Sequence, residues 1–182
     1  FEVYQQSSTL EDWQKYVSSL CIGNSRLIFV LSCAFASALL KRTGDESGGF
    51  HLRGPSSSGK TTALVVASSA WGNAKYLTNW RSTINGLEAT ASLYNDALMP
   101  IDEIGQADSK EVGNTAYMLA NGCGKQRANR SGGAKKKATW RLLFLSSGEI
   151  SLTEQMRQAG KRSYAGQELR IADIQKKKKK GL

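Results

Sequence analysis

A glycine- and serine-rich loop that ends in a lysine is the part of the sequence best suited to chemistry. Residues 54–62 read GPSSSGKTT and match the pattern G-x-x-x-x-G-K-[ST] of a phosphate-binding loop. Glycines allow such a loop to turn tightly, so successive backbone N–H groups converge on phosphates at the positive end of the following helix. We expect nucleotide contacts along the whole loop: Gly54, Pro55, Ser56, Ser57, Ser58, Gly59, Lys60, Thr61 and Thr62.

Two side chains at the end of this loop have specific tasks in the pattern. Lys60 would reach the β- and γ-phosphates, and the Thr61 hydroxyl would bind Mg²⁺, which needs only one or two protein oxygens. A chance glycine- and serine-rich loop is the plain alternative. The flanks favour the functional interpretation, because residues 49–53 are a candidate strand and residues 62–70 a candidate helix.

A second candidate site follows the apolar run 97–101, where a predicted strand delivers Asp102 and Glu103 at its end. Asp102 would hold the magnesium, directly or through water, and Glu103 would polarise the attacking water as general base. A solvated strand end is the alternative for an isolated pair of this kind. Pro100 departs from the pattern, because it removes a hydrogen-bond donor from a strand expected at the centre of a sheet.

Small polar residues also end the predicted strand 140–145. Ser146 or Ser147 could sense the γ-phosphate and orient the water, and we choose Ser147 as the candidate catalytic residue. The alternative is a serine-rich turn that caps the next helix, since serine and glutamate are both common at helix starts.

A basic segment separates the third and fourth predicted strands. Residues 121–137 contain glycines and six basic residues but no acidic residue, which is typical of a loop or hairpin that meets phosphates without reading bases. An ordinary solvated loop remains the alternative, because aromatic residues for stacking are absent before Trp140. The candidate nucleic-acid contacts are Lys125, Arg127, Arg130, Lys135, Lys136 and Lys137.

Arginines near the end of the chain are candidates for a role between subunits. Arg162 or Arg170 could reach a neighbouring subunit's nucleotide and neutralise transition-state charge as an arginine finger. A purely structural arginine is the alternative at either position.

The hydrophobic pattern predicts the elements that must position these residues. Strands are expected at 49–53, 74–77, 97–101, 140–145 and 167–172. Helices are expected at 9–20, 25–41, 62–70, 82–94, 109–120 and 151–159. Because strands alternate with helices, the fold class is α/β, with a parallel five-stranded sheet flanked by helices.

The composition narrows the choice of partners and compartment. Over 182 residues, 25 Lys and Arg against 15 Asp and Glu give a net charge of +10, and the lysines at 176–180 supply five of these charges. An anionic partner is therefore expected, although the total charge overstates the attraction. Three widely spaced cysteines and one histidine favour neither disulfides nor a zinc site, so we expect a cytoplasmic protein. The apolar stretch 27–40 is shorter than the roughly twenty residues of a membrane helix, so no membrane partner is expected.

Several segments, considered together, resemble one known family closely. They are residues 54–64, 80–88, 95–96, 101–106, 116–122, 140–141, 146–149 and 165–167. The series is similar to the bacterial and phage domain-of-unknown-function 927 family, and the resemblance covers about residues 23–174. Members of that family often belong to mobile elements and carry a phosphate-loop ATPase related to helicases of the AAA+ class. The resemblance implies an AAA+-like P-loop NTPase fold, ATP bound by residues 54–61, and Asp102 with Glu103 as the hydrolytic pair.

These expectations combine into one hypothesis with two rivals. We expect a Mg²⁺-dependent ATPase, the core of a helicase or helicase loader of a phage or mobile element, that contacts DNA and works as a homo-oligomeric ring or hexamer. The expected units are an N-terminal helical segment (residues 1–48), the ATPase core (49–174) and a lysine-rich tail (175–182) that is disordered or foreign to the natural protein. The rivals are a P-loop kinase, which transfers phosphate to an acceptor, and a nucleotide switch that drives no movement.

Overall fold

A parallel sheet is the framework of the chain. In the computed structural model, which describes residues 3–128, 133–134, 136–160 and 171–175, five strands lie in the order β2-β3-β4-β1-β5, and all neighbouring pairs are parallel. The strands are β1 (Gly48–Arg53), β2 (Thr78–Asn79), β3 (Ala97–Asp102), β4 (Leu142–Gly148) and β5 (Ile171–Gln175). The late strand β4 lies between β1 and β3. The predicted α/β fold with a five-stranded parallel sheet is confirmed.

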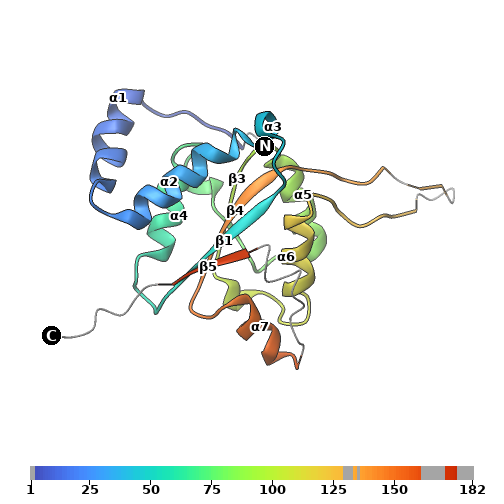
Figure 1. Cartoon of the computed structure of the whole chain (residues 1–182). Coiled ribbons are helices and arrows are strands. Elements are labelled where there is room, and N and C mark those ends of the chain that lie inside the picture. The colour runs from blue at the N-terminus through green and yellow to red at the C-terminus, as the bar shows by residue number, and fades with distance from the viewer. Residues whose placement is uncertain (1–2, 129–132, 135, 161–170, 176–182) are drawn as a thin grey trace.

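Helices cover both faces of this sheet (Figure 1). The α-helices are α1 (Leu10–Trp13), α2 (Ser25–Ser37), α3 (Leu40–Thr43), α4 (Lys60–Ser68), α5 (Ile84–Leu93), α6 (Val112–Ala120) and α7 (Leu152–Gln158). The short helical turns are η1 (Gln14–Ser18, a π-helix) and the 3₁₀ turns η2 (Ser19–Cys21), η3 (Ala74–Tyr76) and η4 (Ile104–Gln106). In Figure 1, α2 and α4 lie to the left of the sheet, and α5 and α6 to its right.

Strand β4 shows how the sequence divides the core into two layers. Leu142 and Phe144 belong to the cluster shared with α5, α6 and α7, whereas Leu143 and Leu145 belong to the cluster shared with α2 and α4. Successive side chains of a strand point to opposite faces, so a continuous apolar run is what a strand covered on both faces requires. Strand β4 is therefore covered on both faces at the middle of the sheet.

Most helix starts follow local capping chemistry. Asn24, Thr83 and Ser151 accept backbone N–H groups in the first turns of α2, α5 and α7, and Ser151 forms a capping box with Glu154. The expected helix over 25–41 instead ends at Ser37, and the short helix α3 follows, closed by a left-handed Gly44.

The second strand is displaced from its predicted position. The apolar pattern predicts a strand at residues 74–77, but residues 74–76 form η3 and the strand begins at Thr78. The Asn73 side chain accepts the Lys75 N–H and starts the turn, and the Tyr76 hydroxyl donates to the Leu98 carbonyl at 2.7 Å. The polar cap and the buried hydroxyl favour a turn where the apolar pattern alone indicates a strand.

The structure explains how β3 accommodates Pro100. Its carbonyl accepts the Thr78 hydroxyl at 2.6 Å, so the backbone groups of Pro100 face β2, the short strand at the edge of the sheet. Partner strand β2 pairs only from Thr78↔Ile101 onward. The Pro100 nitrogen, which has no N–H, therefore faces the start of the short β2 strand. No hydrogen bond at the centre of the sheet is lost.

The first part of the chain packs on the α2–α4 layer. The Trp13 indole N–H donates to the Ser69 hydroxyl at 2.9 Å, and its ring meets Phe35 edge-on at 5.9 Å. Helix α2 itself belongs to the buried cluster of that layer. The predicted N-terminal segment thus shares the core of the sheet, while the boundaries proposed for it stay a prediction.

The structure bears on the expectations about disulfides and membrane helices. Cys21, Cys33 and Cys123 are free thiols, and burial raises the pKa of Cys33 to about 11. Within the described part of the chain, no helix has the length and apolarity needed to cross a bilayer.

The fifth strand, expected at 167–172, is described as β5 from Ile171 onward, and residues 167–170 lie outside the described range.

Candidate nucleotide site at the carboxyl edge of the sheet

The phosphate-binding loop joins β1 to α4 at the carboxyl edge of the sheet. The Gly54 N–H donates to the Gly148 carbonyl at 3.2 Å, which fixes the start of the loop against β4. The loop turns through left-handed conformations at Ser57 (φ 56°) and Gly59 (φ 82°), and α4 begins at the next residue. The backbone N–H groups at the start of α4 therefore open onto the loop, as anion binding requires.

Lys60 curls back over the loop that precedes it. Its ammonium donates to the carbonyls of Gly54 and Pro55, each at 2.9 Å. These two contacts hold the positive charge within the curve of the loop. Phosphate oxygens would compete with these carbonyls for the N–H donors of the ammonium.

Asp102 connects the loop with the end of β4. One carboxylate oxygen accepts the Thr61 hydroxyl at 3.0 Å, and the other accepts the Ser147 hydroxyl and, at 3.1 Å, the Glu103 N–H. These residues lie at the amino end of α4 and at the carboxyl ends of β3 and β4. The three ends meet because the strands are parallel and in register. The structure thus brings together Thr61, Asp102 and Ser147.

The donors at this point suit a hard divalent cation. The Thr61 hydroxyl and the Asp102 carboxylate are oxygen ligands, which Mg²⁺ prefers, and Mg²⁺ takes only one or two protein ligands when phosphates supply others. Among the described residues, no three His, Cys, Asp or Glu side chains gather into a self-sufficient metal site. The residues fit a cation that arrives with a phosphate ligand.

Glu103 lies half-buried beside Asp102 in a left-handed conformation, with φ of 57°. Its N–H donates to both Asp102 and Ser147, and its carboxylate accepts the Gly105 N–H at 3.2 Å. A non-glycine residue in this region costs of the order of 1 kcal/mol and is often found at functional sites. In this structure the carboxylate caps η4 while its backbone is tied to the Asp102–Ser147 pair.

The two serines at the end of β4 have different partners. Ser147 contacts Asp102, whereas the fully buried Ser146 accepts the Trp80 indole N–H at 2.9 Å and contacts His51 Nδ1 at 2.9 Å. Neither serine caps the next helix, because Ser151 does so. The alternative of a serine-rich capping turn is therefore excluded for both.

A buried polar chain lies directly beneath the site, and its only signal in the sequence is a lone histidine in a strand. The Ile150 carbonyl, 2.9 Å from His51 Nε2, can only accept, so Nε2 carries the proton and Nδ1 accepts the Ser146 hydroxyl. Burial lowers the pKa of His51, and the nearby Asp173 partly offsets this effect. A neutral His51 thus joins β1 and β4 to the loop that follows β4.

Gly148 shows how closely this layer is packed. A Cβ atom at this position would lie 2.5 Å from Ile104 Cγ2 and 3.2 Å from the His51 ring. Only glycine leaves room for η4 and the imidazole to pack on the end of β4. The position of Ser147 is therefore fixed by its neighbour as well as by its own hydrogen bonds.

Arg53, the last residue of β1, joins two further elements to the start of the loop. Its guanidinium forms an ion pair with Glu154 of α7 at 3.3 Å, and its Nε approaches Asp173 of β5 at 3.1 Å without a hydrogen-bonding geometry. The contacts of the Glu154 carboxylate with Ser151 and with Arg53 lower its pKa. Sequence patterns offer no sign of this cluster, because its three members are far apart in the chain.

A cavity of about 380 Å³ lies beside the phosphate-binding loop. Its walls come from the start of α2, the end of β1, the loop with the first turn of α4, and β5, and they include Arg26, Leu27, Gly59, Lys60, Thr62 and Ile174. The lining includes the basic residues Arg26, Arg53 and Lys60 and the aliphatic residues Leu27 and Ile174. Sequence patterns do not reveal the contribution of residues 24–27, because they predict only that the segment before the loop packs on the core.

The basic segment forms a hairpin at the opposite end of the strands, between the end of α6 and the amino end of β4. Antiparallel bridges Cys123↔Thr139 and Ala128↔Ala134 join its arms, which extend away from the sheet (Figure 1). Lys125, Lys136 and Lys137 are exposed. Arg127 is also exposed, but its guanidinium is paired with Glu88 of α5 at 2.8 Å.

Four predicted site residues lie outside the described residues. They are Arg130 and Lys135 of the basic segment, and the candidate arginine fingers Arg162 and Arg170. Their roles stay predictions.

The comparison with protein families gives a direct match to the sequence. The model of a family described as "Domain of unknown function (DUF927)" matches residues 2–139, which include the phosphate-binding loop, Asp102 and Glu103. The chain belongs to this family. The resemblance inferred from the sequence is thus confirmed. Among the curated proteins compared with it, none matches the chain.

Solved structures agree with the fold. A structure described as "SCCmec type IV Cch - active helicase" matches with a TM-score of 0.70 and 22% identity, over 96% of this chain and 33% of that chain. This likeness confirms the P-loop NTPase fold. The chain spans about a third of that protein's length.

Two structures of NtrX from Brucella abortus are weaker matches. One has a TM-score of 0.44 and 14% identity over 71% of this chain and 32% of that chain. The other, in complex with ATP, has a TM-score of 0.45 and 15% identity over 90% and 41%. At these TM-scores the two likenesses carry no weight for the site.

Proposed function

We propose that this chain is the ATP-binding and ATP-hydrolysing core of a nucleic-acid motor, a helicase or helicase loader of a phage or mobile element. The observation that carries the proposal is the position of Asp102, which bonds to Thr61 of the phosphate-binding loop and to Ser147 of β4. A loop that only binds phosphate has no need of a carboxylate and a polar strand end at the same point. Hydrolysis needs a carboxylate to hold the cation, and the Ser147 hydroxyl keeps that carboxylate oriented.

In this proposal the phosphate-binding loop holds the triphosphate. Lys60 exchanges its contacts with the Gly54 and Pro55 carbonyls for β- and γ-phosphate oxygens. Thr61 and Asp102 hold Mg²⁺, which supplies positive charge against the phosphates when it is bound. Ser147 stays bonded to Asp102 and orients the carboxylate.

Glu103 is the proposed general base. It directly follows the cation ligand Asp102 in a left-handed conformation, and its N–H donates to Asp102 and to Ser147. To act on water the carboxylate must leave the Gly105 N–H, a movement of one side chain. Catalytic hydrogen bonds are often completed only when substrate is bound.

The cavity of about 380 Å³ beside the loop is the proposed site of the nucleoside. Its size suits a base and ribose, and Leu27 and Ile174 offer aliphatic surface to a planar ring. Arg26 and Arg53 also line this cavity. Direct binding of a fluorescent ATP analogue, with Leu27→Asp as the test variant and Leu39→Asp as an exposed control, checks this assignment.

The motor function rests on the relation of two sites through β4. The basic hairpin lies at the amino end of this strand and Ser147 at its carboxyl end, so one buried strand joins a candidate nucleic-acid contact to the candidate hydrolytic site. The matched structure described as an active helicase supports this class of activity through its fold. A ring or hexamer, with Arg162 or Arg170 reaching the next subunit, belongs to the same proposal.

ATP turnover with and without single- and double-stranded DNA tests the proposal. We expect Glu103→Gln to retain ATP binding but to lose about 10²- to 10⁴-fold of its turnover, because glutamine keeps an acceptor for Gly105 and cannot take a proton. Glu46→Gln, an exposed glutamate before β1, is the matched control. Unchanged turnover in Glu103→Gln would contradict hydrolysis by this pair, and ADP release only with an added acceptor would favour a kinase.

A further inference from the structure

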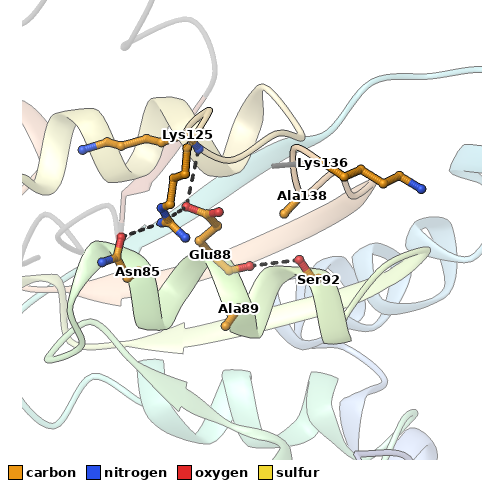
Figure 2. Close-up of a pocket in the computed structure, with 8 residues that line it drawn as sticks. Asn85, Glu88, Ala89, Ser92, Lys125, Lys136 and Ala138 are labelled. Carbon is orange, nitrogen blue, oxygen red and sulfur yellow. Dashed lines mark hydrogen bonds and ion pairs between the residues drawn. The ribbon is translucent and has the colours of Figure 1, made fainter. Parts of the chain in front are cut away.

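Glu88 of α5 is a carboxylate buried beneath the basic hairpin (Figure 2), and we propose that it positions the hairpin for nucleic acid, with Arg127 as its anchor. The residue is only 5% exposed. Its Oε2 accepts Arg127 Nη2 at 2.8 Å and the Lys125 backbone N–H at 3.4 Å. The proposal rests on the proposed nucleic-acid contact and changes the part that Arg127 plays in it.

Arg127 is held at two points of α5. Besides Glu88, its guanidinium donates to the Asn85 side chain at 2.7 Å, and Asn85 lies one helical turn before Glu88 on the same face. The planar guanidinium is thereby fixed in direction. A phosphate contact by the same group would need these bonds to break.

The two partners of this ion pair differ in burial. The Glu88 side chain is 6% exposed and the Arg127 side chain 43%. A carboxylate removed from water is stable when its charge is paired, so loss of Arg127 would leave a buried charge without its partner. An exposed phosphate offers the guanidinium a bond that is screened by salt, and the buried carboxylate is the stronger competitor.

The backbone of the hairpin is fitted to Glu88 as well. A Cβ atom on the buried Gly124 would clash with Glu88 Oε1, so the arm approaches the carboxylate more closely than any side chain would allow. Gly124, Lys125 and Arg127 therefore contact the carboxylate through a bare Cα, an N–H and a guanidinium. The first arm of the hairpin is built around this carboxylate.

The remaining lysines are left for phosphate. Lys125 and Lys136 line a cavity of about 200 Å³ between α5 and the two arms, and both are exposed (Figure 2). Lys137 follows on the second arm and is exposed too. The Glu88–Arg127 clamp fixes the first arm, from which Lys125 extends, and leaves the lysine side chains themselves free of Glu88.

Amide hydrogen exchange of the hairpin tests the clamp without any nucleic acid. In Glu88→Gln and in Arg127→Gln, we expect amides of residues 121–128 and 136–140 to exchange about tenfold faster. The double substitution should add little to either single one, because both remove the same interaction. Arg127→Lys should fall between them and the unmodified chain, and Arg42→Gln, which changes an exposed arginine of α3, should leave the hairpin unaffected. Unchanged exchange in Glu88→Gln would overturn the proposal.

Binding of single-stranded DNA over a series of salt concentrations separates an anchor from a direct phosphate ligand. If Arg127 is the anchor, Glu88→Gln and Arg127→Gln both weaken binding several-fold and leave the slope of log K against log salt unchanged. If Arg127 binds phosphate, Arg127→Gln lowers the slope by about 0.7 while Glu88→Gln retains or tightens binding, which would overturn the proposal. Failure of the unmodified chain to bind DNA would contradict the proposed function, and the exchange experiment would still decide the clamp.

Discussion

The two ends of strand β4 are built in opposite ways. At the carboxyl end, Ser147 is fully buried and bonded to Asp102, and a buried chain of Trp80, Ser146 and His51 supports it. At the amino end, exposed hairpin arms join the body through the Glu88–Arg127 ion pair and the buried Trp140. Chemistry needs atoms fixed within fractions of an ångström, whereas a phosphate backbone can be met by charges that adapt. The difference suggests one end built for reaction and the other for binding.

Substitution of Lys60 gives the largest expected effect and breaks the comparison at its carboxyl end. In Lys60→Ala the phosphates lose their ammonium partner, and we expect ATP turnover to fall about 10²- to 10³-fold. Hydrogen exchange of the hairpin should not change, because the substitution lies at the other edge of the sheet. Lys41→Ala, at an exposed lysine of α3, is the control, and similar turnover in both variants would contradict the assignment of the loop.

The adjacent serines of β4 separate support from chemistry. Ser146→Ala leaves the Trp80 N–H and His51 Nδ1 without their shared partner, so we expect the free energy of unfolding to fall by about 1–3 kcal/mol. Ser147→Ala should lower ATP turnover, and it should reduce the free energy of unfolding less than Ser146→Ala does. Its partner is the half-buried carboxylate of Asp102 at the carboxyl end of β3. Chemical denaturation and turnover assays on both variants check this. Equal effects on stability would contradict separate roles for the two positions.

Removal of three hairpin lysines tests the amino end of β4. With Lys125, Lys136 and Lys137 all changed to Gln, we expect single-stranded DNA affinity to fall about tenfold and the salt slope to decrease by about 0.7 for each phosphate that is no longer bound. The unfolding midpoint should stay constant, since all three side chains are exposed. Affinity that is insensitive to these changes would place the nucleic-acid surface elsewhere on the chain.

The pH dependence of stability gives the smallest effect and reports on the support beneath the site. Burial lowers the pKa of His51 in the folded chain, so between this value and the unfolded value near 6.5 only the unfolded chain binds the proton. Stability from this group is therefore complete above pH of about 6.5 and declines as the pH falls, by at most about 1.4 kcal/mol per pH unit.

His51 is the one histidine of the chain, which makes the measurement specific. Denaturation at pH values between about 5 and 7.5 should show the decline in the unmodified chain and a flatter profile in His51→Gln. Identical profiles would mean that His51 is not shielded from protons in the folded state.

Local patterns predict most of the elements because their causes are local. Alternation of apolar runs with caps indicates the parallel sheet, and the glycines and lysine of residues 54–61 indicate the loop. The prediction of a strand at 74–77 is wrong because the Asn73 side chain caps a turn and the buried Tyr76 hydroxyl needs a hydrogen-bond partner. These two contacts override the apolar pattern. Propensity is a weak guide where one polar contact decides between turn and strand.

The choice between Ser146 and Ser147 shows what a pattern leaves open. Both residue types fit a polar strand end, and the alternation of a strand says only that they face different ways. The position of Asp102, far earlier in the chain, decides that Ser147 joins the site. Charge likewise groups Arg127 with the hairpin lysines, and the ion pair with Glu88 separates it from them.

The phosphate-binding loop, the two carboxylates at the end of β3 and the α/β fold follow from the sequence alone, because each depends on residues adjacent in the chain or on a repeating pattern. The folded chain was needed to show which polar groups meet: Asp102 with Ser147, His51 with Ser146, and Glu88 with Arg127. Such pairs depend on strand order and register, which bring together residues distant in sequence. Their strength comes from burial, which only the folded chain provides.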